Sequence, residues 1–157
     1  MGNNLQTYLH DHLAGAQFAT SLLADMAAQT FDADIAAFAS VLLSEIEEDK
    51  QVAEEILTRL DAKRSMLKEA SAWLAQKMGR TKFHLESDRF SLFEALEILS
   101  IGILGKLALW KALGEVSAKV EELQARDFAA LAERAIGQHE QVEQQRIAFA
   151  NSLIAEI

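Results

Sequence analysis

The chain has 157 residues, of which 24 are Asp or Glu and 15 are Lys or Arg, so its formal net charge is −9. It contains no Cys, which excludes disulfides, thiol catalysis and metal sites with cysteine ligands. The acidic balance argues against nucleic acid and anionic membranes as partners, because both attract basic surfaces. We expect residues 1–157 to form one domain, since domains commonly have roughly 100–150 residues.

No segment of the sequence is typical of a membrane anchor. Residues 1–6 lack the positive charge and the apolar run of a signal peptide. A spanning helix needs roughly 20 mostly apolar residues. The most apolar stretch, residues 92–113, is interrupted by Glu94, Glu97, Lys106 and Lys111. We therefore expect a cytoplasmic protein with no membrane association.

Apolar residues recur every three or four positions along four long segments, which predicts an all-α fold. The predicted long helices cover residues 4–28, 34–60, 92–113 and 128–154, and a shorter helix over 64–78 lies in the long connector between the second and the third. The absence of Pro favours long helices. Asp32 is a good N-cap for the second helix, and Ser91 with Glu94 predicts a capping box for the third. Together these features predict a four-helix bundle.

The predicted helix over 92–113 is apolar on nearly all sides, which is typical of a helix buried on several faces. Either the connector helix or a second subunit would cover it, and we expect a homodimer. Gly102 and Gly105 lie on one side of this helix and would let a neighbouring backbone approach closely. Together with Gly15 and Ala16, these glycines leave open a small-ligand pocket as a third possibility.

Polar residues interrupt the apolar seams of all four helices, where they would face the interior of the bundle. They are Tyr8 and His12 on the first helix, Glu45 and Asp49 on the second, Glu97 on the third, and His139, Glu143 and Arg146 on the fourth. Carboxylates and imidazoles that face one another inside a bundle are able to hold metal ions. The alternative is a buried network that fixes the helix register, with Arg146 and Lys106 neutralising the carboxylates. Glu97 and His139 would then form a carboxylate–imidazole pair.

Two short segments suggest a family. The opening Tyr8-Leu9-His10-Asp11-His12-Leu13-Ala14-Gly15 and the run Glu45-Ile46-Glu47-Glu48-Asp49 resemble small bacterial proteins of the ferritin-like superfamily. The resemblance implies a four-helix bundle with a long connector between the second and third helices. It also implies a di-metal centre made of a Glu from each of two helices and a Glu-x-x-His from each of the other two.

The sequence departs from that ligand set on three helices. The second helix offers Glu45-x-x-Glu48 without a His, Ile136 stands where the partner Glu of His139 belongs, and residues 4–28 contain no Glu. We therefore expect a non-catalytic binding or structural module without a standard di-iron site. The other hypothesis is a metalloprotein that handles iron or manganese at a non-standard site. Its metal candidates are His12, Glu45, Asp49, Glu97 and His139.

The direction of the third helix separates these hypotheses. A connector that crosses the bundle makes the third helix parallel to the second, so that Glu97 lies near the opposite end from His12, roughly 15 Å or more away. The connector is long enough to cross, so we expect two separate polar clusters rather than one metal centre.

Overall fold

The computed structural model describes residues 2–62 and 88–154, and each regular element within those ranges is a helix. The four long helices are α1 (Gly2–Gln29), α2 (Ala33–Ala62), α4 (Arg89–Val116) and α5 (Phe128–Ile154). Two short 3₁₀ helices, η1 (Ser117–Lys119) and η2 (Glu121–Leu123), join α4 to α5. The predicted all-α fold with four long helices is confirmed, while the helix predicted over 64–78 lies outside the described residues.

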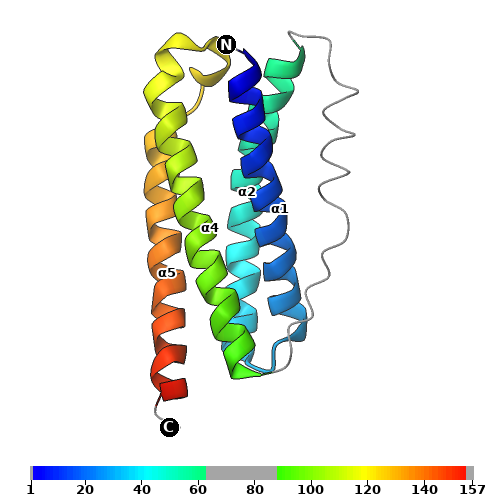
Figure 1. Cartoon of the computed structure of the whole chain (residues 1–157), viewed down its shortest axis with the longest axis vertical. Helices are drawn as coiled ribbons and strands as arrows, with labels where there is room; N and C mark the ends of the chain where they lie inside the picture. Colours follow the sequence, from blue (N-terminus) through cyan, green and yellow to red (C-terminus); the bar gives the residue numbers. More distant parts are fainter. Residues whose placement is uncertain (1, 63–87, 155–157) are drawn as a thin grey trace.

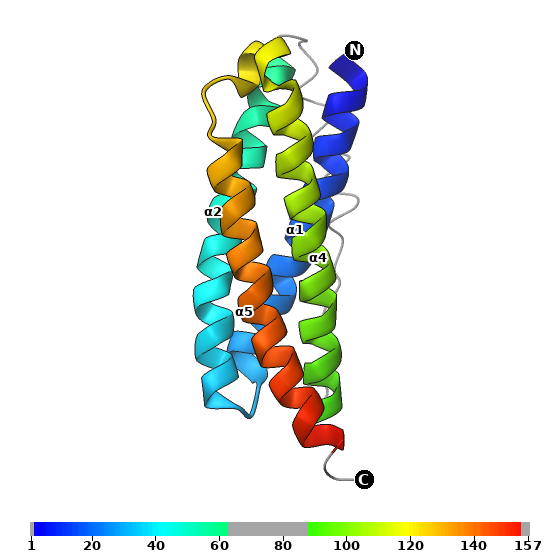
Figure 2. The same ribbon diagram turned by 90° about the vertical axis from the view of Figure 1, so that its left-hand side faces the viewer.

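The helices pack as two antiparallel hairpins that lie side by side. α1 packs along α2, and α4 packs along α5 (Figure 1). Between the two hairpins, α1 and α4 are in more extensive contact than α2 and α5. α4 runs in the same direction as α2, as expected for a connector that crosses the bundle (Figure 1). The second view shows α5 beside both α4 and α2 (Figure 2). The bundle therefore brings α2, α4 and α5 around a common interior.

Helix ends are fixed by side-chain caps. Asp32 is the N-cap of α2, because its carboxylate accepts the backbone N–H groups of Asp34 and Ile35 at 3.0 and 3.1 Å. The predicted start of the third helix is wrong by one turn: α4 begins at Arg89, and the carboxylate of Asp88 accepts the backbone N–H of Ser91 at 2.7 Å. Asp88 is therefore the N-cap residue, and Ser91 lies inside the first turn of the helix. A capping box that starts at Ser91 is not needed, because Asp88 already accepts a backbone N–H of that turn.

The core runs the full length of the bundle, and each long helix contributes one apolar stripe. Its largest fully buried side chains are Leu9, Leu13, Leu22, Leu23, Met26, Ile35, Leu42, Ile56, Leu96, Leu99, Trp110 and Leu113. Leu123, in η2, is also fully buried and closes the end of the bundle where α4 turns into α5. An ion pair between Arg126 and Glu55 ties this turn to α2.

One face of α4 is exposed among the residues that the structure describes. Ile98, Ile101 and Leu104 are 44%, 65% and 47% exposed, although they belong to the most apolar helix of the chain. A helix that is apolar all round here buries only part of its circumference against α1 and α5. Among the described residues, no helix has the length and apolar character that a membrane crossing requires.

Candidate functional site

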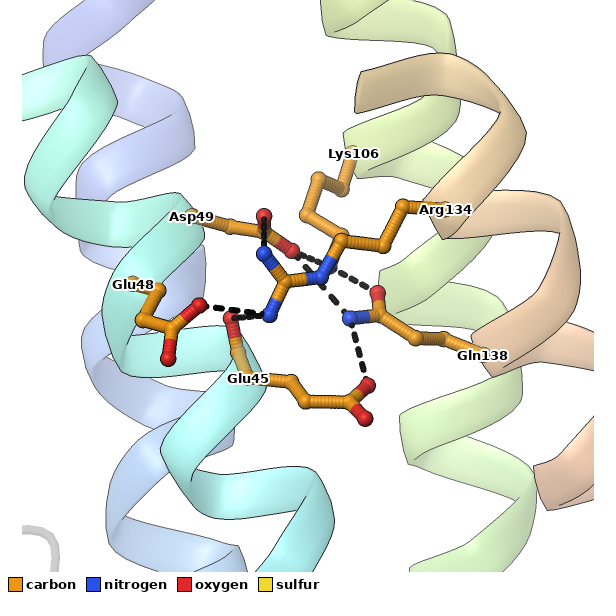
Figure 3. A network of polar contacts seen from close by, with 6 residues as sticks. All are labelled: Glu45, Glu48, Asp49, Lys106, Arg134 and Gln138. Carbon is orange, nitrogen blue, oxygen red and sulfur yellow. Dashed lines mark hydrogen bonds and ion pairs between the residues drawn. The ribbon is translucent and has the colours of Figure 1, made fainter. Parts of the chain in front are cut away.

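The interior between α2, α4 and α5 holds a cluster of ionic and amide side chains, which we call the Lys106 cluster. Figure 3 shows α2 on one side and α4 and α5 on the other, with the polar groups converging between them. Asp49 and Gln138 are each only 1% exposed, so the centre of this cluster is buried. Its members are Glu45, Glu48, Asp49, Lys106, Arg134 and Gln138.

Lys106 crosses from α4 to the acidic side of α2. Its ammonium donates to Asp49 Oδ2 at 2.5 Å and also to the side-chain oxygen of Gln138. Asp49 therefore has a buried cation as its direct partner. A carboxylate buried without such a partner would be strongly destabilising.

Gln138 and Arg134, both on α5, complete the cluster. The Gln138 amide nitrogen donates to Glu45 at 3.0 Å and to Asp49 at 3.3 Å, while its oxygen accepts from Lys106. The Arg134 guanidinium bonds Glu48 at 2.9 Å and lies 3.6 Å from the second Asp49 oxygen (Figure 3). One amide thus satisfies donors and acceptors from both hairpins at once.

Burial sets the electrostatics of Lys106. The loss of hydration lowers the pKa of Lys106, and the charge and hydrogen bond of Asp49 oppose that shift. Three carboxylates and two cations belong to the cluster, which leaves one net negative charge. Lys106 pairs with Asp49 and Arg134 pairs with Glu48, so the carboxylate without an ion pair is Glu45, which accepts from the neutral amide of Gln138.

A second group, the Arg146 cluster, lies further along α4 and α5 and comprises Glu97, Ser100, His139, Glu143 and Arg146. Arg146 donates two hydrogen bonds of 2.8 Å to Glu143 and one of 3.3 Å to Glu97. The Ser100 hydroxyl donates to Glu143 at 2.6 Å and lies 3.1 Å from His139 Nε2. The hydrogen bonds from Arg146 and then Ser100 lower the pKa of Glu143 to about 2.

The proton positions in the Arg146 cluster argue against a serine nucleophile. Because the one hydroxyl proton of Ser100 goes to Glu143, His139 must donate from Nε2 to Ser100 Oγ. A nucleophilic serine would instead donate to the histidine. Ser100 is also only 6% exposed. The arrangement is a hydrogen-bonded structural network rather than an acyl-transfer site.

The structure brings together some of the predicted site residues and separates others. Glu45 and Asp49 both accept hydrogen bonds from Gln138. Arg146 bonds both Glu97 and Glu143, and Ser100 contacts both Glu143 and His139. The predicted direct pair of Glu97 with His139 is wrong, since Arg146 takes Glu97 and Ser100 takes His139. Two clusters form rather than one, because Ser100 and Lys106 lie six residues apart on α4, a rise of about 9 Å.

His12 and Tyr8 lie apart from both clusters. Their rings make an edge-to-face contact with centroids 4.6 Å apart. Among the hydrogen bonds described for residues 2–62 and 88–154, none joins His12 to Glu45 or Asp49, although His12 and Asp49 line the same cavity. Burial lowers the pKa of His12 against the opposing charge of Asp11, which favours the neutral imidazole.

No group of three or more His, Asp or Glu side chains is placed to hold a metal ion among residues 2–62 and 88–154. The carboxylates that the sequence analysis offered as ligands already accept hydrogen bonds from Lys106, Gln138 and Arg146. Arg134 and Gln138 are the members to which sequence reasoning assigned no role. The signal for Gln138 was present, because an amide occupies an apolar seam position of α5.

A cavity of about 100 Å³ adjoins the Lys106 cluster between α1, α2 and α4. Its polar lining residues include His12, Asp49, Lys50 and Lys106, and most of its wall is aliphatic.

Comparison with protein-family models, with curated proteins and with solved structures finds no significant match to this chain. The interpretation of the two clusters therefore rests on their own geometry.

Replacing Lys106 with Met should lower the free energy of unfolding by about 3 kcal/mol, because it leaves Asp49 buried without its ammonium partner. The double variant Asp49→Leu with Lys106→Met should recover most of that loss, since neither charge then remains. Urea unfolding followed by circular dichroism measures all three proteins. Lys119→Met, at an exposed position in η1, is the matched control and should change stability by less than about 0.5 kcal/mol.

The Glu143 carboxyl should titrate near 2 rather than near its ordinary value of 4.5. A lowered folded-state pKa means that Glu143 stabilises the fold above pH 4.5, and that this contribution is lost as the pH falls towards 2. Carbon-13 NMR of the side-chain carboxyl measures the titration directly. In Arg146→Met the Glu143 pKa should rise, because two of its three hydrogen bonds are lost. An unchanged value in that variant would contradict the assignment to Arg146.

Proposed function

We propose that this chain is a ferritin-like four-helix bundle that acts as a non-catalytic binding module without a standard di-metal centre. Support for the ferritin-like arrangement comes from its two antiparallel hairpins and from α4 running parallel to α2 across a long connector (Figure 1). The location that we propose is the cytoplasm, on the sequence expectation stated above.

The observation that carries the proposal is the Lys106 ammonium between Asp49 and Gln138. A cation among carboxylates inside a bundle neutralises them where a metal ion would otherwise be needed. Lys106 supplies that charge covalently, from a helix that contributes no carboxylate to this cluster. Glu45 is likewise bound by the amide of Gln138, so its oxygen is already used. The ionic groups therefore support a structural role for the cluster.

The competing hypothesis is a metalloprotein that uses iron or manganese at His12, Glu45, Asp49, Glu97 or His139. That hypothesis requires Lys106 to release Asp49 and Gln138 to release Glu45 before a metal ion binds. Each release leaves a buried polar group that must find another partner.

Elemental analysis separates the two hypotheses. We expect the purified protein to hold no near-stoichiometric iron or manganese, either as isolated or after anaerobic incubation with ferrous iron and desalting. Glu45→Ala should therefore not change the metal content, and its helical content should be retained. Glu47→Ala, at an exposed neighbouring position, is the matched control. Stoichiometric metal in the native protein that disappears in Glu45→Ala but stays in Glu47→Ala would overturn the proposal.

We further propose that the exposed face of α4 binds a second copy of this chain. Ile101 and Leu104 are the centre of this face, and Ala108 continues it along the helix. A contiguous apolar face of this kind is typical of a protein contact. Gly105 is adjacent and has no atom within 4 Å of a Cβ built on it, so another helix has room to approach.

The charges at the two ends of this face favour a symmetric pair of antiparallel α4 helices. A twofold axis between Ile101 and Leu104 places Glu94 of one copy opposite Lys111 of the other, because both pairs are centred on the same point of the helix. Glu94 and Lys111 are both exposed, and no ion pair is described for either within residues 2–62 and 88–154. A second copy thus meets opposite charges at both ends of the apolar strip.

Analytical ultracentrifugation tests this contact. Lys111→Glu should weaken the dimer about tenfold, because like charges then face each other at both ends, and the added change Glu94→Lys should restore it. Ile101→Glu should give a monomer. Ile147→Glu, at a similarly exposed apolar residue of α5, is the control and should leave the dimer intact. A native protein that sediments as a monomer at high micromolar concentration would contradict the proposed dimer.

A further inference from the structure

The cavity between α1, α2 and α4 is large enough for a small organic molecule. Its volume of about 100 Å³ is somewhat smaller than the roughly 150 Å³ apolar cavity that binds benzene in another protein. It lies in the seam where Gly15 and Ala16 of α1 face Gly102 of α4. A Cβ built on Gly15 or Gly102 meets no atom within 4 Å, so the seam is open rather than tightly packed at these glycines.

The charged groups in the wall have partners of opposite charge or polar partners, although Asp49 Oδ1 accepts no hydrogen bond and lies 3.6 Å from Arg134. Lys106 is paired with Asp49, and Lys50 donates to Gln17 at 2.7 Å and lies 3.5 Å from Glu54. His12 is held towards its neutral form by burial. The rest of the wall is mostly aliphatic, with Leu13, Ile46 and Leu99 among its residues. A charged ligand would therefore lose its hydration without gaining a free counter-charge, which favours a neutral ligand.

One donor in the wall has no partner. Trp110 is 1% exposed and lines the cavity, and its indole N–H makes no hydrogen bond with any described residue. Buried donors in native proteins are nearly always satisfied, and an unmade hydrogen bond costs more than a typical one contributes. Because Trp110 belongs to the wall and its N–H is unpaired, a ligand with an acceptor atom is the complementary occupant.

We propose that this cavity binds a neutral, mainly apolar small molecule of about six non-hydrogen atoms that carries one hydrogen-bond acceptor, such as a carbonyl oxygen, for the Trp110 indole. The aliphatic wall takes the hydrocarbon part and Trp110 fixes its orientation. The inference rests on the binding role proposed above, since it names the class of ligand for that role. It does not depend on the α4 contact between copies.

NMR of the nitrogen-15-labelled protein tests the proposal with two probes of the same shape. Cyclopentanone carries a carbonyl oxygen where methylenecyclopentane carries a CH₂ group. Cyclopentanone should shift the Trp110 indole N–H resonance downfield and saturably, and methylenecyclopentane should not shift it downfield. Trp73→Phe assigns the resonance, because the chain has two tryptophans.

Variants locate the bound probe and measure the hydrogen bond. Gly102→Leu should abolish the saturable shift by filling the cavity, whereas Gly137→Leu, at an open position of α5 that does not line it, should preserve it. In Trp110→Phe the affinity for cyclopentanone relative to methylenecyclopentane should fall about tenfold. Because Trp110 is a large core residue, the shift in the unmodified protein decides the question if this variant does not fold.

The absence of a saturable shift in the unmodified protein would overturn the inference, as would equal binding to Gly102→Leu. Neither result bears on the metal content that elemental analysis would measure, so a failure of the ligand inference is distinguishable from a failure of the metal-free role. Uptake of stoichiometric iron would overturn that role by elemental analysis, whatever the indole resonance shows.

Discussion

The buried ion pair between Lys106 and Asp49 is the interaction on which the interior of this bundle depends. Removing two charges from water costs several kcal/mol for each ion, and this cost is offset only when both ions are paired and hydrogen-bonded. Gln138 meets that condition, because it bonds both members of the pair from a third helix. α2 and α5 have few close backbone contacts, so these polar contacts join the two hairpins along that side of the bundle (Figure 3).

The same requirement explains why the polar residues divide into two clusters. Each cluster is close to self-sufficient: a cation from α4 or α5 sits among carboxylates, and a neutral polar side chain supplies the remaining hydrogen bonds. The clusters are about two turns apart along α4. Because neither leaves a carboxylate without a partner, neither requires the other or an added ion to be stable inside the bundle. In a shared metal centre, by contrast, the carboxylates of both clusters would depend on one ion.

The helices and the inward direction of Glu45 and Asp49 could be predicted from periodicity, because a seam position in a long amphipathic helix has few alternatives. The hydrogen-bonding partners of these carboxylates could not be predicted in the same way. Lys106 was visible as an interruption of the apolar helix, but Arg134 lies at the edge of its stripe and reaches Glu48 only through a long side chain. Such reach depends on how two hairpins are placed, which the periodicity of one helix does not specify. For the same reason Glu97 was assigned to His139 rather than to Arg146.

The cavity follows from the position of the ion pair. The ammonium of Lys106 is directed towards α2 and α5, and three of the α1 residues in the cavity wall, Gly15, Ala16 and Ala19, are small. Those residues cannot fill the space that the long side chain leaves beside it, and close packing would normally remove such a void. Leu or Ile at these positions of α1 would fill it. The small residues therefore keep open a volume whose wall includes Trp110, a residue with an unpaired indole N–H, and packing alone does not require that combination.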